Sequence, residues 1–180
     1  MENRKLAAHQ LLHEFGLLDK LREIGPAHVT GSYRMDLMAW NDLDVNVEND
    51  SMNLDKLYDL TAFTMRTFRP VWFEAKEEIH PAGKKVWFHG FETTVTGELW
   101  NVDLWFFDRE TIREAERFCD GIAAKTSPAQ KDAIVRIKTE LIARGMYSFE
   151  QFKSMDVYHA VLEKGAKNIE DFLAIFQQKQ

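Results

Sequence analysis

The stretch at residues 30–47 reads TGSYRMDLMAWNDLDVNV, and it decides the fold that we expect for this chain. A Gly-Ser pair closes one apolar run, and an Asp-Leu-Asp triplet lies inside the next. Alternate residues of a β-strand point to the same side and are about 6–7 Å apart. Asp42 and Asp44 therefore share one face of a predicted strand, while Leu43, Val45 and Val47 face a core on the other side.

A third carboxylate, Asp103, interrupts the apolar run LWNVDLWFF at residues 99–107. If this run forms a strand beside the first, about 4.8 Å away, the three carboxylates meet at one point. Converging carboxylates repel each other unless a cation lies between them, and Mg²⁺ suits such a site because it leaves positions to water and substrate phosphates. A pair of ions about 3.5–4 Å apart would clamp the attacking and leaving oxygens of a displacement at phosphorus.

Gly31 and Ser32 add a second feature of the same chemistry. Glycine lets the backbone approach a phosphate closely, and the serine can donate its hydroxyl and its amide hydrogen. The plain alternative is that Asp42 and Asp44 are solvated residues at the end of a strand. The third acid favours the site, because Asp103 would be costly to bury inside so apolar a strand without a compensating partner.

These residues resemble the minimal nucleotidyltransferase superfamily, which includes antibiotic nucleotidyltransferases and small antitoxin-type enzymes. The resemblance covers roughly residues 25–108 and rests on Gly31-Ser32, Asp42, Asp44 and Asp103. It implies an α+β fold, with a nucleotidyltransferase-like mixed β-sheet flanked by helices. It also implies that the three Asp residues bind Mg²⁺, that Asp103 helps to activate an acceptor hydroxyl, and that Gly31 and Ser32 position a triphosphate.

The function implied by this resemblance is Mg²⁺-dependent nucleotidyl transfer. An acceptor hydroxyl attacks the α-phosphorus of a nucleoside triphosphate, two Mg²⁺ ions assist, and pyrophosphate leaves. ATP, CTP, GTP and UTP all stay open, and the acceptor is a small molecule or a protein side chain. The rival hypothesis is a nucleotide-binding or partner-binding protein of the same fold that transfers nothing, such as one component of a toxin–antitoxin pair.

Basic side chains near the motif are weaker candidates for phosphate binding. Arg34 could neutralise a phosphate just beyond the bend, or it could pair with Asp36 or Glu48 at the surface. Further along the chain, Arg136 and Lys138 could face a triphosphate. Their position in an amphipathic helix favours solvent-exposed charges instead.

The least apolar connection of the first half, residues 77–85, holds further candidates for nucleotide or acceptor contacts. They are His80 and Lys84, with His89 on the strand that follows. Lys84 or Lys85 could meet a phosphate, but an exposed turn lysine is the more ordinary outcome. For the histidines, too, a hydrogen bond at the surface or packing in the core is the more ordinary outcome.

Hydrophobic periodicity divides the rest of the chain into helices and strands. Residues 3–24 predict a helix with a break at Gly16, and shorter helices are expected at residues 33–38 and 54–68. Strands are expected at residues 27–30, 42–48, 71–74, 86–91 and 99–107. From residue 110 onward only helices are expected, so we predict a catalytic core at residues 1–109 and a helical C-terminal extension, packed on that core, at residues 110–180.

Composition limits the partners of the chain. The 180 residues carry a formal charge of −6, and the 23 Lys and Arg residues are dispersed, so nucleic acid is an unlikely partner. The single Cys119 excludes an internal disulfide, and the start MENRKLAAHQ lacks the apolar core of a signal peptide. We therefore expect a cytoplasmic protein without a membrane anchor, and we leave a homodimer open.

Overall fold

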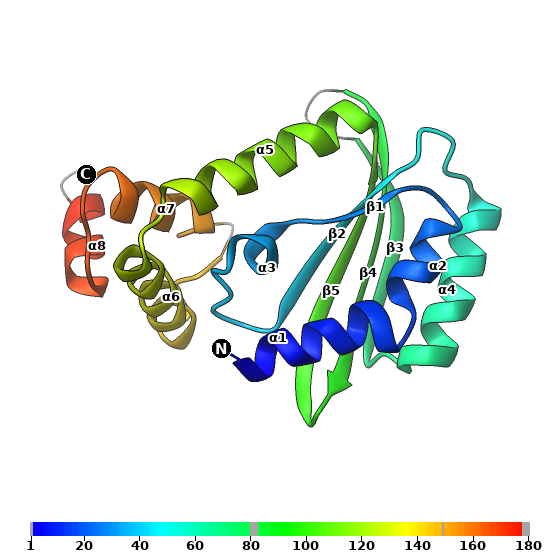
Figure 1. Ribbon diagram of the computed structural model, residues 1–180, viewed down its shortest axis with the longest axis horizontal. Coiled ribbons are helices and arrows are strands. Elements are labelled where there is room, and N and C mark those ends of the chain that lie inside the picture. Colours follow the sequence, from blue (N-terminus) through cyan, green and yellow to red (C-terminus); the bar gives the residue numbers. More distant parts are fainter. Residues whose placement is uncertain (1, 80–82, 149, 178–180) are drawn as a thin grey trace. The chain divides into compact units, whose positions relative to one another are not determined.

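The computed structural model describes residues 2–79, 83–148 and 150–177 (Figure 1). The chain divides into two compact units. The first comprises Met1–Met35 and Asn41–Cys119, and the second comprises Asp36–Trp40 and Asp120–Gln180. Among the described residues, no helix is both long enough and apolar enough to span a membrane.

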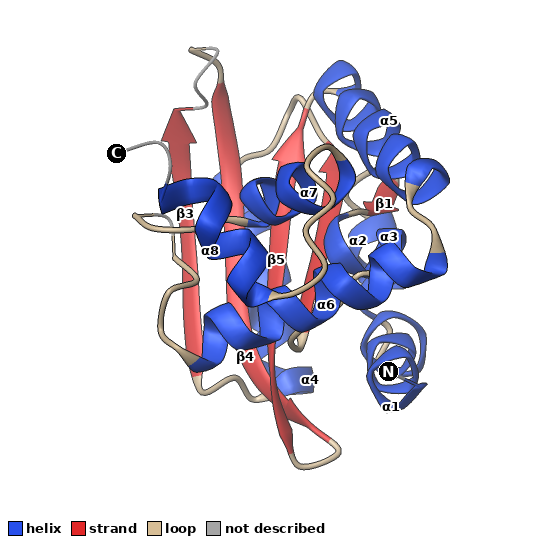
Figure 2. Ribbon diagram, turned by 90° about the vertical axis from the view of Figure 1, so that its left-hand side faces the viewer, coloured by secondary structure: helices blue, strands red, loops and turns tan. Residues whose placement is uncertain are grey.

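The first unit contains a five-stranded mixed β-sheet in the order β1-β2-β5-β4-β3 (Figure 2). The strands are β1 Ala27–Val29, β2 Asp42–Glu48, β3 Trp72–Ile79, β4 Lys85–Val95 and β5 Glu98–Phe107. Strands β2 and β5 are parallel, and the other neighbours are antiparallel. This sheet with its flanking helices confirms the predicted α+β class.

Helices of the first unit flank both faces of this sheet (Figure 1). They include α1 Glu2–His9, a π-helical turn Gln10–Glu14, α2 Leu17–Arg22, α3 Gly31–Met35, α4 Leu54–Phe68 and the beginning of α5 Arg109–Lys125. Helix α2 contacts β1 and α4, and α4 contacts β4, so these two helices lie on the same side of the sheet (Figure 1). The predicted break at Gly16 is confirmed, because this residue has φ +74° and separates the two N-terminal helical segments.

Alternation along β2 and β5 creates the core beneath α2 and α4. Leu43, Val45 and Val47 are fully buried, as are Val102 and Leu104 of the parallel partner strand. Helix α4 adds Leu60, and its last residue Phe68 packs against Phe91 of β4 with ring centroids 5.0 Å apart. The opposite face of the sheet therefore receives the polar residues of the Asp-Leu-Asp triplet.

Several predicted elements have different bounds in the structure, among them the strand expected at residues 86–91, which is Lys85–Val95. The strand expected at residues 71–74 continues to Ile79, although its second half is highly charged. Strand β3 lies at the edge of the sheet, where charged side chains can remain in water and even protect the edge. The helix expected at residues 33–38 instead begins at Gly31 and ends at Met35, because Asp36 adopts the left-handed region at φ +61°.

The second unit is helical, as the sequence predicts. It contains the end of α5, α6 Pro128–Ala143, α7 Ser154–Leu162 and α8 Ile169–Gln177, and α6 contacts both later helices. Ser127 caps α6 through a reciprocal capping box with Gln130, which explains why the helix begins where the Ser-Pro pair predicts. The interpretation of Lys138 as a solvent charge is wrong, because its side chain is only 1% exposed and lies near the rings of Tyr147 and Tyr158. Arg136 is exposed, as expected.

Candidate active site

The predicted carboxylates lie on one face of the sheet. Asp44 of β2 is paired with Asp103 of β5 in the parallel register, and Asp42 is paired with Asn101. Neighbouring strands are about 4.8 Å apart and alternate residues share a face, so all three carboxylates project to the same side. Each of the three is partly buried.

The Gly-Ser bend lies directly against this group. A Cβ atom on Gly31 would lie only 1.8 Å from Asp44 Oδ2, and Gly31 also has φ +62°, a region that glycine tolerates best. The Thr30 amide donates to the Asp44 carbonyl oxygen at 3.0 Å, which joins the bend to β2. Ser32 Oγ is buried and has no hydrogen-bond partner among the described residues. The bend therefore leaves a hydroxyl beside the carboxylates.

Asp103 has the most perturbed electrostatics of the three. Burial first, and then the charges of Asp42 and Glu74, raise the pKa of its carboxyl to about 6, while a hydrogen bond from Asn101 acts in the opposite direction. Asn101 Nδ2 also donates to Asp42 Oδ1 at 2.9 Å. Asn101 thus connects the two acids, a role that sequence spacing alone did not reveal.

Gly90 and Glu74 complete the row of residues beside Asp103. Gly90 of β4 is paired with Asp103, and Glu74 of β3 is paired with Gly90. A Cβ atom on Gly90 would lie 3.2 Å from Asp103 Oδ1 and 2.4 Å from Cζ of Phe88. A glycine inside a strand often marks a place where another group comes close to the backbone. Gly90 in the sequence was therefore a signal that a side chain, here that of Asp103, lies against this strand.

The donor set has the chemistry of a magnesium site. Three carboxylates on adjacent strands offer hard oxygen ligands, and the like charge of Asp42 that raises the pKa of Asp103 would be relieved by a cation. Within the described ranges, however, no three His, Cys, Asp or Glu side chains are already arranged as a metal-binding group. The three carboxylates therefore fit Mg²⁺ by their residue type and by the register of their strands, and not by a ready-made coordination geometry.

Arg34 makes a contact that the sequence did not predict. Its guanidinium donates to Glu116 Oε1 on α5 at 2.8 Å, and Glu116 also lies 3.2 Å from His28 Nδ1. The other ring nitrogen of His28 lies 3.3 Å from Glu48. This ion-pair group joins β1, β2, α3 and α5. A phosphate-binding role for Arg34 stays a prediction.

Lys84 lies away from the carboxylates, at the other end of the sheet. Its ammonium pairs with Asp108, directly after β5, whereas Asp103 is level with Gly90. Six strand residues separate Lys84 from Gly90, which corresponds to roughly 20 Å. His80 lies outside the described residues. His89 is fully buried on the opposite face of the sheet, where it is paired with Leu104.

Comparisons with known proteins agree on the fold. No family model and no curated protein matches the chain. A structure of the Cid1 poly(U) polymerase with Mg and 3′-dATP bound matches with a TM-score of 0.61 and 18% identity, over 90% of this chain and 49% of that chain. A cytoplasmic RNA terminal U-transferase matches with a TM-score of 0.59 and 18% identity, over 90% of this chain and 48% of that one.

A third structure extends the same likeness. The non-canonical poly(A) polymerase complex GLD-2–GLD-3 matches with a TM-score of 0.60 and 14% identity, over 93% of this chain and 56% of that chain. The chain thus spans about half the length of these solved proteins. It has a nucleotidyltransferase-like fold.

Proposed function

We propose that this protein is a Mg²⁺-dependent nucleotidyltransferase that moves a nucleoside monophosphate from a nucleoside triphosphate to an acceptor hydroxyl. The observation that carries the proposal is the pairing of Asp44 with Asp103 in adjacent strands, with Gly31 in contact with Asp44. The carboxylates and the Gly-Ser bend therefore lie on one face of the sheet, which supports the proposal. The nucleotidyltransferase-like fold supports the same chemistry.

In this proposal Asp42, Asp44 and Asp103 hold two Mg²⁺ ions. Bound Mg²⁺ supplies neutralisation of the charge that develops on the phosphate oxygens. Asp103 accepts the proton of the acceptor hydroxyl as the hydroxyl oxygen bonds to the α-phosphorus and the bond to the pyrophosphate oxygen breaks. In the metal-free protein the pKa of this carboxyl is about 6, mainly because it is buried, so Asp103 is mostly ionised at pH 7 and ready to bind a cation or accept a proton.

The bend has the complementary task of holding the triphosphate. Gly31 carries no side chain that would keep a phosphate away from Asp44, and Ser32 Oγ is available to donate a hydrogen bond. Asn101 positions Asp42 through its amide. Nucleotide-binding roles for Arg34 and Lys84 remain predictions, since their ion pairs with Glu116 and Asp108 do not argue for them.

Two acceptor classes follow from different observations. The formal charge of −6 and the dispersed basic residues favour a hydroxyl of a small molecule or a protein. The comparison with an RNA terminal U-transferase favours RNA. We propose the first class and treat RNA as the second candidate.

We also propose three further properties of the protein. They are a division into a core at residues 1–109 and a helical extension at residues 110–180, a cytoplasmic location, and a homodimer.

The direct test is to incubate the protein with each α-labelled nucleoside triphosphate and Mg²⁺, in the presence of small hydroxylated metabolites and antibiotics, a protein lysate, or RNA. We expect label on one acceptor class and release of pyrophosphate. Asp42→Asn and Asp44→Asn should reduce transfer by several orders of magnitude, to a small residual rate, without unfolding the protein. Asp55→Asn, an equal charge change at an exposed position of α4, is the matched control.

Two results would count against the proposal. Normal turnover by both Asn variants would remove Asp42 and Asp44 from the site. Mg²⁺-dependent binding of a nucleotide without pyrophosphate release, over the whole acceptor panel, would favour the rival hypothesis of a non-catalytic nucleotide-binding or partner-binding protein.

A further inference from the structure

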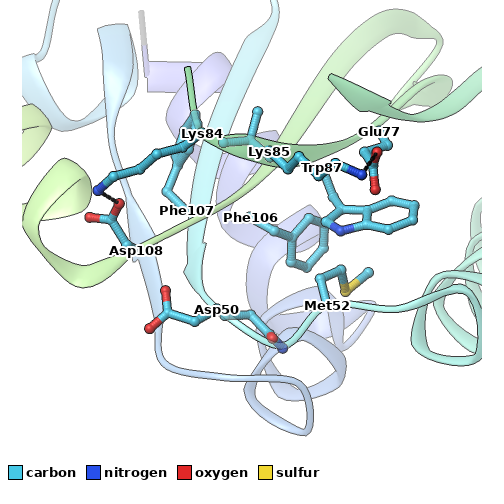
Figure 3. Close-up of a pocket in the computed structure, with 11 residues that line it drawn as sticks. Asp50, Met52, Glu77, Lys84, Lys85, Trp87, Phe106, Phe107 and Asp108 are labelled. Carbon is cyan, nitrogen blue, oxygen red and sulfur yellow. Dashed lines mark hydrogen bonds and ion pairs between the residues drawn. The ribbon is translucent and has the colours of Figure 1, made fainter. Parts of the chain in front are cut away.

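A pocket in the first unit lies far from the carboxylates (Figure 3). It has a volume of about 270 Å³ and is formed by the segment after β2, the facing ends of β3 and β4, and the end of β5. Phe106 is the residue of the pocket that lies nearest to Asp103 along β5. Asp108, at the far end of the pocket, follows Asp103 by five residues, which corresponds to roughly 16 Å along a strand. The pocket is therefore separate from the candidate active site.

Apolar side chains form one part of this pocket. Trp87 and Phe106 are paired across β4 and β5, and Met52 lies beside them (Figure 3). Phe106 and Met52 are buried, whereas Trp87 is partly exposed and presents an indole ring to a ligand. An aromatic ring with a neighbouring thioether is a favourable surface for a flat or cationic group.

The segment after β2 is held in place by its own hydrogen bonds. The Asn49 amide donates to the Phe107 carbonyl oxygen at 3.1 Å, and the Asn49 side chain donates to the Ile24 carbonyl oxygen at 3.0 Å. The Ser51 amide donates to Asn49 Oδ1 at 2.9 Å. Because these bonds fix the wall that carries Asp50 and Met52, the pocket does not need to be assembled by a ligand.

Charged residues around the pocket have an excess of one carboxylate. Lys85 pairs with Glu77 at 2.9 Å, and Lys84 pairs with Asp108, so these four charges cancel. Asp50 is exposed and close enough to Lys84 to help raise the pKa of that ammonium, but it forms no ion pair within 4.0 Å among the described residues. In Figure 3, Asp50 and Asp108 lie on one side of the pocket and Trp87 and Met52 on the other.

We infer that this pocket is a second binding site, which takes a small organic cation with an apolar or aromatic body. The ammonium group of the ligand lies at Asp50, and its body lies against Trp87, Met52 and Phe106. The excess negative charge favours a cation over an anion. An ammonium group is attracted both to the carboxylate on one side of the pocket and to the indole face on the other. The volume is just below the range of about 300–1,000 Å³ for drug-sized ligands, so the ligand is smaller than a nucleotide.

Benzylammonium is the probe, and the measurement is the shift of the Trp87 indole N–H signal in a proton–nitrogen NMR titration of the full chain. Benzyl alcohol and benzoate are the neutral and anionic probes of similar shape. We expect benzylammonium to bind more tightly than either of them. Asp50→Asn should weaken its binding about threefold, the effect of losing one exposed ion pair.

Variants at Trp87 and at a position outside the pocket test whether ligand binding depends on the residues of the pocket. Trp87→Leu should weaken binding of benzylammonium about threefold or more, followed through the signals of neighbouring residues. Asp55→Asn should leave binding unchanged, because Asp55 lies outside the pocket. Equal affinity for benzyl alcohol, tighter binding of benzoate, unchanged affinity in Asp50→Asn, or no shift at Trp87 would each overturn the inference.

Discussion

The buried carboxyl of Asp103, to which we assign the proton transfer in our proposal, lowers the stability of the fold at neutral pH. Its pKa is raised to about 6 in the folded protein, from the ordinary value of 3.8, mainly because the carboxyl is buried. The folded state therefore binds more protons than the unfolded state between these two values. Stability falls as pH rises through this window, and the whole penalty is present above it.

Asp103→Asn should accordingly stabilise the metal-free protein at pH 7. The expected gain in the free energy of unfolding is up to about 3 kcal/mol, because one pKa unit corresponds to about 1.36 kcal/mol. The gain should vanish near pH 3.5. Urea unfolding of both proteins in the presence of a chelator, at the two pH values, measures this, and a less stable variant at pH 7 would contradict the account.

His89 has the opposite pH dependence. The ring is fully buried, neither nitrogen has a hydrogen-bond partner among the described residues, and burial lowers its pKa to about 4. The unfolded state binds more protons between pH 6.5 and 4. The stability contributed by the neutral ring is therefore complete above pH 6.5 and is lost as pH falls through this range.

Replacing His89 by leucine should remove this acid sensitivity. Between pH 7 and pH 4 the wild-type protein should lose up to about 3 kcal/mol more of its free energy of unfolding than His89→Leu. Urea unfolding at both values measures the difference, and the contribution of Asp103 is common to the two proteins. An identical pH dependence would show that the ring is hydrated or hydrogen-bonded.

At the scale of elements, the contact between α3 and β2 holds the candidate site together. Gly31 begins α3, and a methyl group there would collide with the Asp44 carboxylate. Gly31→Ala should therefore displace this carboxylate and reduce nucleotidyl transfer about a hundredfold, a typical effect of a 1 Å displacement in an active site. Labelled transfer at saturating nucleotide is the measurement.

Gly16 provides a matched control for this variant. It has φ +74°, but a Cβ atom there would meet nothing within 4 Å. Gly16→Ala should destabilise the protein by about 1 kcal/mol through backbone strain, as Gly31→Ala also should, yet leave transfer intact. If both variants lost transfer equally, strain and not the displaced carboxylate would be responsible.

The sequence predicts elements well where the determining signals are local. Helix α4 has the predicted bounds because Asn53 caps it and its apolar face repeats regularly. Strand β2 alternates as expected, and its register with β5 brings Asp44 level with Asp103. The alternation of residues along each strand was thus enough to predict that the carboxylates of the candidate site share one face of the sheet.

Features that the sequence did not predict depend on distant contacts. The charged half of β3 is a strand because it pairs with β4 at the edge of the sheet. Arg34 pairs with Glu116, which is 82 residues away in the chain. Lys138 is buried between aromatic residues of the second unit, and an amphipathic pattern alone did not distinguish such a lysine from a solvated one.

At the scale of the whole molecule, the acceptor class has a consequence for salt dependence. Proteins that contact several nucleic-acid phosphates lose affinity steeply between about 50 and 200 mM salt. With a formal charge of −6 and dispersed basic residues, the protein should instead transfer label to a small molecule or protein at a rate that changes little over this range. A steep loss, seen with RNA as the labelled acceptor, would favour the second candidate.

The central claim is that the acids of β2 and β5 act as one unit, and a double-mutant cycle tests it most directly. Transfer of an α-labelled nucleotide is compared for the wild type, Asp44→Asn, Asp103→Asn and the double variant. Groups that work together are not additive, so the double variant should be no slower than the slower single variant. Multiplied losses in the double variant, or normal transfer by either single variant, would contradict the claim.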